Sequence, residues 1–251
     1  MFTKVKTEEE LKAMRHSGQL LAQVLKVLSR KIEPGMTTKD LAEIAKDELR
    51  STGGQPTFLG YQGFPDVLCV SVNDEVVHGI PRNSRKIESG DIVSMDFGVT
   101  YDGMITDSAI TVIVDKPLSK RHAELVADTK KALEAGISVV KDNVTVANIS
   151  AAIEKILKKG NYGIVKDLVG HGVGHNLHED PNIPNYVSNG KNIHLLKGMT
   201  IAIEPMATLG TDQVITDLDN WTIRTADGSV AAHFEHTVLV TEDTVEVLTK
   251  Q

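Results

Sequence analysis

The sequence predicts an α+β fold in which helices pack on one face of a mainly antiparallel sheet. Helix-like and strand-like segments come in separate runs instead of alternating, which is typical of this class. The order of two helices followed by strands is found twice along the chain. With 251 residues, of which 41% are hydrophobic, the chain is long enough for one substantial core.

The first half begins with two predicted helices. Thr7 and Glu10 resemble a capping box, and apolar residues then recur at helical spacing, which predicts a helix over residues 8–31. A second helix starts after Thr37-Thr38 and runs to Gly53-Gly54. The expected buried faces consist of Leu11, Met14, Leu21, Val24, Leu25 and Leu28 in the first helix and Leu41, Ile44, Ala45 and Leu49 in the second.

Strands follow each helix pair. In the first half they are VLCVSVN, DIVSMDFGV and MITDSAITVIV. The second half has predicted helices over 119–141 and 146–159, and then the strands GIVKDLVG, MTIAIEPM and HFEHTVLVT. Each half therefore has the same order of elements.

An offset of 108 residues aligns the two halves. It matches helix with helix and "PGMTTKDL" with "DNVTVANI". We interpret this as a weak internal repeat, about 8–115 and 116–251, inside a single domain over 1–251, because no low-complexity linker separates the halves. The alternative is a chance similarity between two amphipathic helix pairs.

Composition excludes several classes of protein. No apolar run reaches the roughly 18 residues of a membrane span, and the start MFTKVKTEEEL is unlike a signal peptide, so we expect a cytoplasmic protein. Cys69 is the single cysteine, which rules out an internal disulfide and a cysteine-based zinc cluster. The net charge of −7 disfavours stable binding of nucleic acid.

Two acids lie within a predicted β-hairpin. If Asp102-Gly103 forms a two-residue turn, position 96 faces 109 and position 98 faces 107. Asp96 and Asp107 then lie diagonally on one face of the hairpin, roughly 7 to 8 Å apart at the backbone. The alternative is that both acids face solvent, where they need no partner.

Other strands carry side chains of the same ligand class. "GHGVGHNLHEDP" contains His171 and His178, "AIEPM" ends an apolar strand with Glu204, and "HFEHTVLV" places Glu235 in a strand. Each residue alone could be a satisfied core residue or half of an ion pair. Arg224 is the main candidate counter-ion, and one arginine cannot neutralise four carboxylates.

This ligand set predicts a metal centre. Four carboxylates and one imidazole suit Mn, Fe, Co or Zn. So many anionic ligands exceed the needs of one ion, so we expect two divalent ions about 3.5 to 4 Å apart. A bridging water between them would act as a hydroxide nucleophile, which implies metal-assisted hydrolysis.

The ordered motifs resemble those of methionine aminopeptidases of type I. They are "VHGIP" at 77–81, "DFGVTYDGMITD" at 96–107, "GHGVGHNLHEDP", "KGMTIAIEPM" and "FEHTVLVT". The resemblance implies the pita-bread fold, built from two pseudo-symmetric halves. It also implies that Asp107 and Glu235 bridge two metals, that His171 and Glu204 complete one of them, and that Asp96 completes the other.

The resemblance also implies the remaining site residues. His178 would polarise the scissile carbonyl, His78 would hydrogen-bond the scissile amide, and Glu204 would carry the proton to the leaving amine, while the substrate α-amine would bind on the Asp96 side. The methionine pocket would be lined by Phe58, Tyr61, Phe64, Cys69 and Trp221. Leu177 and His175 differ from common versions of the motif, which leaves the shape of the pocket open.

The activity implied is removal of the N-terminal methionine from nascent proteins and peptides, with a preference for a small second residue. The resemblance further implies a transient contact with the ribosome, and we expect a monomer. Three alternatives share the metal set or the fold. Proline-directed enzymes usually have an extra N-terminal domain, type II enzymes have an insertion between Glu204 and Glu235, and a binding module of this fold would have lost its metal ligands.

Overall fold

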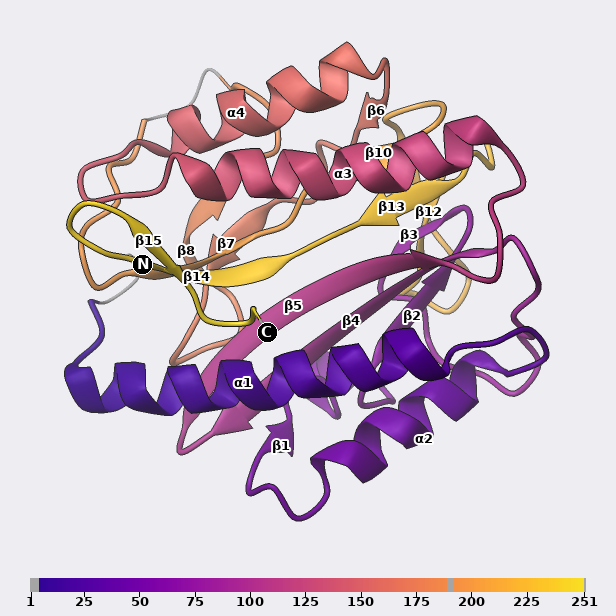
Figure 1. Ribbon diagram of the computed structural model, residues 1–251, viewed down its shortest axis with the longest axis horizontal. Coiled ribbons are helices and arrows are strands. Elements are labelled where there is room, and N and C mark those ends of the chain that lie inside the picture. Colours follow the sequence, from indigo (N-terminus) through magenta and orange to yellow (C-terminus); the bar gives the residue numbers. More distant parts are fainter. Residues whose placement is uncertain (1–4, 189–191, 251) are drawn as a thin grey trace.

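Four helices cover one face of the strands in the part of the chain that the structure describes (Figure 1). The structure is a computed structural model, and it describes residues 5–188 and 192–250. One pair of helices lies over each half of the strands. The pairs are α1 (Glu8–Lys31) with α2 (Thr38–Leu49), and α3 (Lys120–Ser138) with α4 (Val146–Lys159).

Within residues 5–188 and 192–250 the strands form two larger and two smaller antiparallel sheets. In the first half β4 lies between β1 and β2 and also pairs with β5, and in the second half the order is β15-β14-β9-β7-β8. The smaller sheets have the orders β13-β10-β6 and β11-β12-β3. The strands are β1 (Gln55–Pro56), β2 (Cys69–Val72), β3 (Glu75–Val77), β4 (Ile92–Tyr101), β5 (Met104–Ile113), β6 (Gly163–Ile164), β7 (Gly170–Gly172), β8 (Glu179–Ile183), β9 (Thr200–Ile203), β10 (Met206–Thr208), β11 (Val214–Thr216), β12 (Ile223–Thr225), β13 (Ala231–His233), β14 (His236–Val240) and β15 (Val245–Val247); η1 (Tyr61–Gly63) is a short 3-10 turn.

Local sequence signals set the helix starts. The capping box of Thr7 and Glu10 is present, and helix α1 covers the predicted residues. Helix α2 ends at Leu49, earlier than the predicted Gly53-Gly54. It ends there because Arg50 leaves the helical region at φ −57° and ψ 134°, and Ser51 follows with a positive φ of 70°.

The hairpin that carries the two acids has the predicted register. Tyr101 pairs with Met104 and Asp96 with Ala109. Asp102 and Gly103 have positive φ angles of 48° and 76°, as a type I′ turn requires. This turn therefore puts Asp96 and Asp107 on the same face, as expected.

Three predicted strands of the second half were wrong in extent. Only Gly163–Ile164 of GIVKDLVG is a strand before β7 begins at Gly170. MTIAIEPM divides into β9 and β10 at Glu204-Pro205, where proline lacks the N–H that a continuous strand would need. HFEHTVLVT divides at Phe234-Glu235, so Glu235 lies between β13 and β14 and not within a strand.

The division follows from the sheet pairing. β9 pairs with β14, whereas β10 pairs with β13. The segment β9–β10 and the segment β13–β14 therefore both pass from one sheet to the other, and they do so side by side. The short strands β1, β3, β8, β11, β12 and β15 were not predicted.

The two halves repeat in detail. An isolated β-bridge joins Thr37 to Lys86 in the first half, and a second joins Thr145 to His194 in the second half. Both residues of the second bridge lie 108 positions after the corresponding residues of the first. Thr37 and Thr145 are also the N-caps of α2 and α4. The predicted α+β fold of two pseudo-symmetric halves is confirmed, whereas the domain limits of 8–115 and 116–251 stay a prediction.

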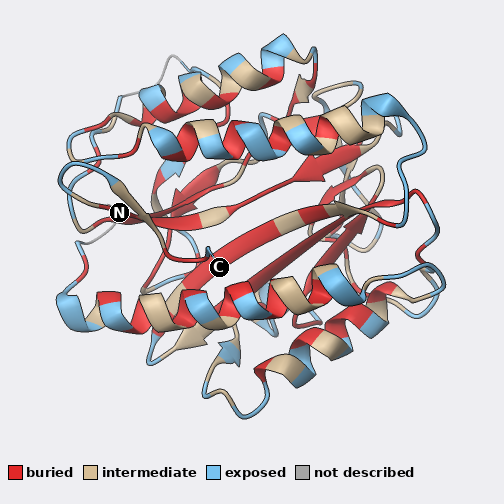
Figure 2. Cartoon of the chain, viewed as in Figure 1, coloured by how far each residue is buried: buried red, intermediate tan, exposed pale blue. Residues whose placement is uncertain are grey.

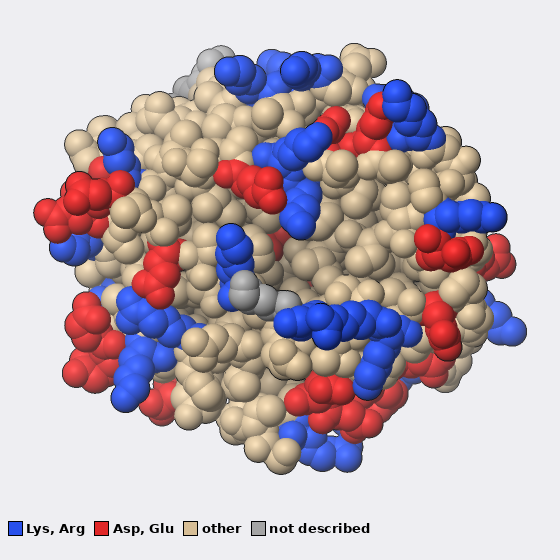
Figure 3. Space-filling model, viewed as in Figure 1, with Lys and Arg blue, Asp and Glu red and all other residues tan. Residues whose placement is uncertain are grey.

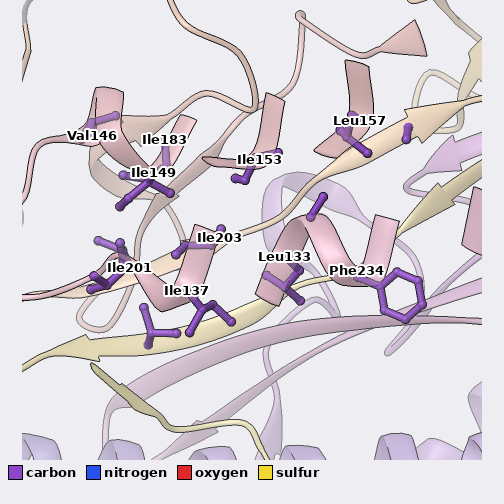
Figure 4. Packing of buried hydrophobic residues seen from close by; sticks show 14 of the residues in the cluster. Leu133, Ile137, Val146, Ile149, Ile153, Leu157, Ile183, Ile201, Ile203 and Phe234 are labelled. Carbon is purple, nitrogen blue, oxygen red and sulfur yellow. The ribbon is translucent and has the colours of Figure 1, made fainter. Parts of the chain in front are cut away.

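Apolar side chains fill the space between each helix pair and its strands. Figure 4 shows Leu133 and Ile137 of α3, with Ile149 and Ile153 of α4, packed near Ile201 and Ile203 of β9. A separate cluster lies under α1 and α2. Figure 2 shows the strands as mostly buried and the helices with alternating buried and exposed positions.

The outer face of the helices is polar. Basic and acidic side chains are interspersed over it, as Figure 3 shows. Among the described residues we find no helix with the length and apolar character needed to cross a membrane.

Shortening a buried side chain in this core should destabilise the fold. Ile153 is fully buried in the cluster under α4, so Ile153→Ala should lower the free energy of unfolding by about 2 to 5 kcal/mol. Urea unfolding measures this loss. Ile215→Ala is the matched control, because Ile215 is 53% exposed. Equal losses in both variants would contradict the packing described.

Candidate metal centre

A cavity of about 180 Å³ contains every site residue that the sequence predicted. Its walls come from both halves of the chain. Gln62 and Leu177 also line it. The predicted residues that line it are Phe58, Tyr61, Phe64, Cys69, His78, Asp96, Asp107, His171, His178, Glu204, Trp221 and Glu235.

The joint between the two halves places Asp107 beside Glu235. Glu235 N donates to Ala109 O at 2.9 Å, and Ala109 N donates to Glu235 O at 3.3 Å. Thr237 extends this joint, because its hydroxyl accepts from Asp107 N at 2.9 Å and donates to Asp107 O at 2.7 Å. Two acids from distant segments are thus fixed through their backbones.

Asp96 and Glu204 occupy equivalent positions in the two halves. Asp96 lies on β4, and Glu204 lies 108 residues later, directly after β9. Asp96 is 9% exposed and Asp107 4% exposed, so neither faces solvent. The alternative that these acids lie on a solvent face is therefore wrong.

His171 is oriented for ligation by its own strand. Its Nδ1 lies 2.9 Å from the carbonyl oxygen of Gly172, which can only accept, so Nδ1 carries the proton. Nε2 is the nitrogen that faces the carboxylates, and it lies 3.5 Å from Glu204 Oε1. Such a backbone bond to the distal nitrogen is typical of metal-ligating histidines.

Burial shifts the protonation of the carboxyl groups. Desolvation raises the pKa of Asp96 to about 6, and the charge of Glu204 adds to the rise. Desolvation and the neighbouring carboxylates raise the pKa of Asp107 and of Glu235 well above their usual values. Burial would also raise the pKa of Glu204, but the imidazoles of His233 and His171 outweigh it and lower that pKa.

Arg224 does not serve this cluster. Its guanidinium binds Asp74 at 2.8 Å, Glu75 at 2.9 Å and Asp217 at 2.6 Å. These bonds attach β12 to the start of β3, outside the cavity. The counter-ion that the sequence suggested is therefore committed elsewhere.

The donor set fits a divalent cation. Asp96 Oδ1, Asp107 Oδ1 and Glu235 Oε1 are buried and have no hydrogen-bond partner among the described residues. Ligand atoms of Asp107, His171 and Glu235 all lie within 4.8 Å of one another. Buried anionic oxygens without donors are costly, and a hard or borderline cation would satisfy all of them at once.

His178 projects a hydrogen-bond donor toward the cavity. Desolvation, with the nearby His171, lowers the pKa of His178 to about 4, so the ring is neutral at pH 7. Gln62 Nε2 donates to the Tyr61 hydroxyl at 3.3 Å, and this hydroxyl lies 2.9 Å from His178 Nδ1. Tyr61 can therefore donate to Nδ1, which leaves the proton of the neutral ring on Nε2.

The other end of the cavity is apolar. Phe58, Phe64, Cys69 and Leu177 form a buried cluster, and the Trp221 ring contacts Phe64 edge-on with centroids 5.2 Å apart. Desolvation and Asp96 raise the pKa of the Cys69 thiol well above its usual value. A protonated, buried thiol serves as a small apolar group and not as a nucleophile.

His78 borders both ends. It has a positive φ of 59°, and its ring lies 6.4 Å from that of Trp221. Burial lowers the pKa of His78, so this imidazole is also neutral at pH 7.

Comparison with known proteins identifies the family. Residues 12–242 match Metallopeptidase family M24. The chain belongs to this family. The methionine aminopeptidase of Aquifex aeolicus is 42% identical over 252 residues, with 97% of each chain covered. The crystal structure of methionine aminopeptidase from Thermotoga maritima has a TM-score of 0.97 and 41% identity, with 100% of both chains covered.

These relatives confirm the resemblance drawn from the motifs and the pita-bread fold. As a member of family M24 the protein is a metallopeptidase and therefore a hydrolase. A prolidase from Pyrococcus furiosus shares the fold with a TM-score of 0.79 at 23% identity, and only 65% of that chain is covered. The chain thus covers all of the Thermotoga maritima aminopeptidase chain but only about two thirds of the prolidase chain.

Sequence reasoning missed two polar residues of this M24 site. His233 is 1% exposed, and its Nε2 lies 3.3 Å from Glu204 Oε2. A signal was available, because residues two apart in an extended segment share a face and His233 precedes Glu235 by two. Gln62 had no such signal, since its contact with Tyr61 depends on the turn of η1.

Without metal, this M24 protein should lose stability as pH rises. Asp107 and Glu235 have folded pKa values above their unfolded ones, so their contribution is present below about pH 4 and is lost as pH rises through the folded values. Thermal unfolding of chelator-treated protein from pH 6.5 to 8.5 measures this, above the range in which His178 titrates. Asp107→Asn should show a smaller decline, and added Mn²⁺ should flatten it; equal slopes in all samples would be inconsistent with repelling carboxylates.

Proposed function

We propose that this protein is a methionine aminopeptidase that removes the N-terminal methionine from nascent proteins and peptides. The observation that carries the proposal is a cluster of buried carboxylates and imidazoles at one end of a small apolar cavity. Relatives at about 40% identity over nearly the full chain have this name and support it. The cavity of about 180 Å³ is below the roughly 300 Å³ of common ligand pockets, so it suits one side chain.

Asp96, Asp107, His171, Glu204 and Glu235 would hold two divalent ions, drawn from Fe, Mn, Co or Zn. In this proposal Asp107 and Glu235 would contribute ligands to both ions, Asp96 to one of them, and His171 and Glu204 to the other. Bound there, the ions would supply a water of lowered pKa that attacks as hydroxide, an anchor for the substrate α-amine, and polarisation of the scissile carbonyl. The four carboxylates offset the charge of two dications.

The protein's own groups would stabilise and move charge. His178 donates from Nε2–H to the carbonyl oxygen as negative charge develops on it, and its neutral ring keeps this proton at pH 7. His78 hydrogen-bonds the scissile amide. Glu204, whose pKa is lowered, is ionised and accepts the proton of the attacking water before it passes to the leaving amine.

The apolar end would select methionine. Phe58, Phe64, Leu177 and Trp221 offer aromatic and aliphatic contacts to an unbranched thioether, for which sulfur–aromatic contacts are favourable. A second residue with a small side chain would fit beside the metal ligands. We further propose that the protein acts in the cytoplasm as a monomer, with a transient contact to the ribosome and without stable binding to nucleic acid or membrane.

The peptide Met-Ala-Ser tests this function. The protein with Mn²⁺ or Co²⁺ should release methionine, and chelator should abolish the release until metal is restored, because the nucleophile depends on bound metal. Asp107→Asn should lower kcat/KM by at least about 10²-fold through loss of a shared ligand. Free methionine is measured by chromatography.

Two further readings separate the alternatives. Calorimetric titration of chelator-treated protein should show two Mn²⁺ sites in the native chain and weaker binding in Asp107→Asn. A protein that binds Met-Ala-Ser but never cleaves it would be a binding module of this fold. Cleavage of Xaa-Pro peptides in preference to Met-Ala-Ser would point to a proline-directed enzyme.

His178→Ala should lower kcat more than it raises KM. The lost donor acts on charge that develops in the transition state, and removal of one such donor costs about 10²- to 10³-fold in kcat. Steady-state hydrolysis of Met-Ala-Ser measures both constants. His194→Ala is the control, since His194 is exposed and bonds Asn143 outside the cavity; a rise in KM alone for His178→Ala would assign this residue to binding.

A further inference from the structure

The segment 174–179, which carries part of the cavity wall, is attached to the N-terminal segment 6–10. Leu177 and His178 of this segment line the cavity. Its neighbours His175 and Glu179 point instead to residues more than 160 positions earlier in the chain. The N-terminal segment is thus in contact with the back of the cavity wall.

Glu179 is the centre of this attachment. Its Oε1 accepts from His175 N at 2.7 Å and from Asn176 N at 2.9 Å. Its Oε2 accepts from Lys6 Nζ at 2.8 Å. The Lys6 side chain is 0% exposed and that of Glu179 9% exposed, so this is a buried ion pair and not a surface one.

His175 makes a second connection. Its Nε2 lies 2.8 Å from Glu10 Oε1, while the other oxygen of Glu10 accepts from Thr7 N at 2.7 Å in the capping box of α1. Its Nδ1 lies 3.6 Å from Glu179 Oε1. The start of α1 and the cavity segment are therefore joined through one carboxylate and one imidazole.

Both carboxylates of this attachment, Glu10 and Glu179, have lowered pKa values, as their hydrogen bonds to donors require. The backbone bond from Thr7 and the His175 side chain hold the pKa of Glu10 at about 2. Burial would raise the pKa of Glu179, but the hydrogen bonds from Lys6 and Asn176 outweigh it and lower that pKa. Both carboxylates are thus ionised at neutral pH, opposite an ammonium group and an imidazole.

We infer that Glu179 is a positioning residue: with Lys6 as its counter-ion, it holds the backbone at 175–176 so that Leu177 and His178 face the cavity. The inference deepens the proposed function, on which the kinetic consequence rests. Tyr61 holds the His178 ring from the cavity side. Glu179 holds the backbone at His175 and Asn176, just before His178, so the position of this ring depends on both contacts.

Hydrogen exchange tests the positioning without any substrate. In Glu179→Ala the amides of His175 and Asn176 lose their acceptor, so a peptide covering 174–179 should exchange at least about tenfold faster. Arg15→Ala is the matched control, because Arg15 also joins α1 to the sheet through a bidentate bond to Glu246, at 2.7 and 2.8 Å, away from the cavity. Unchanged exchange in Glu179→Ala, or the same acceleration in Arg15→Ala, would overturn the inference.

Kinetics test the consequence. Hydrolysis of Met-Ala-Ser by Glu179→Ala should show a raised KM and a lowered kcat together, at least about tenfold in kcat/KM, because a wall residue and a donor are displaced together. Arg15→Ala should leave both constants unchanged. If the native protein does not cleave the peptide, the proposed function fails, while the exchange experiment still decides the positioning role.

If Glu179→Ala does not fold, a milder single variant, Glu179→Gln, can be compared with a double variant that also carries Lys6→Met. Glu179→Gln keeps an oxygen for the two amides but turns an amide donor toward the Lys6 ammonium. Adding Lys6→Met removes this conflict, so the double variant should exchange more slowly at 174–179, and cleave faster, than Glu179→Gln alone. A double variant no better than Glu179→Gln in both measurements would contradict the pairing with Lys6.

Discussion

The pair of backbone hydrogen bonds between Ala109 and Glu235 is the contact on which the whole site depends. It joins the hairpin of the first half to the end of the second, and it puts Asp107 and Glu235 against each other inside the fold. Thr237 reinforces this joint from the adjoining strand with two bonds to the Asp107 backbone. Because the connection is made by backbone groups, the acidic side chains stay available for ligation.

The joint has an electrostatic consequence. It brings like charges together out of water, and the raised pKa values of Asp96, Asp107 and Glu235 reflect first this desolvation and then repulsion from neighbouring carboxylates. Arg224, which could have relieved it, binds three other acids. An interior of this kind is stable near neutral pH when cations supply the missing charge. Stability and the catalytic chemistry of a metallopeptidase thus have the same origin here.

The apolar end of the cavity shows the opposite electrostatic character, because it holds no carboxylates of the metal-ligand cluster. Its apolar cluster is flanked by imidazoles that burial keeps neutral, so His178 can donate a hydrogen bond without adding a cation. The orientation of this ring depends on Tyr61 in front and on the backbone segment behind it. That segment is in turn tied to the first turn of α1 through Glu179 and Lys6. Residues at the N-terminus therefore shape a pocket formed mainly by the rest of the chain.

The sequence by itself determined the elements whose signals are local. Thr7 and Glu10 define a helix start within four residues, and Asp102-Gly103 sets a hairpin register that places Asp96 and Asp107 on one face. The family resemblance also named most of the residues that line the cavity, though not Gln62. Tertiary structure alone decided where GIVKDLVG and HFEHTVLVT break, and that Lys6 pairs with Glu179. These features join segments far apart in the chain, and such contacts arise from sheet pairing and burial, which leave no periodic pattern in either segment.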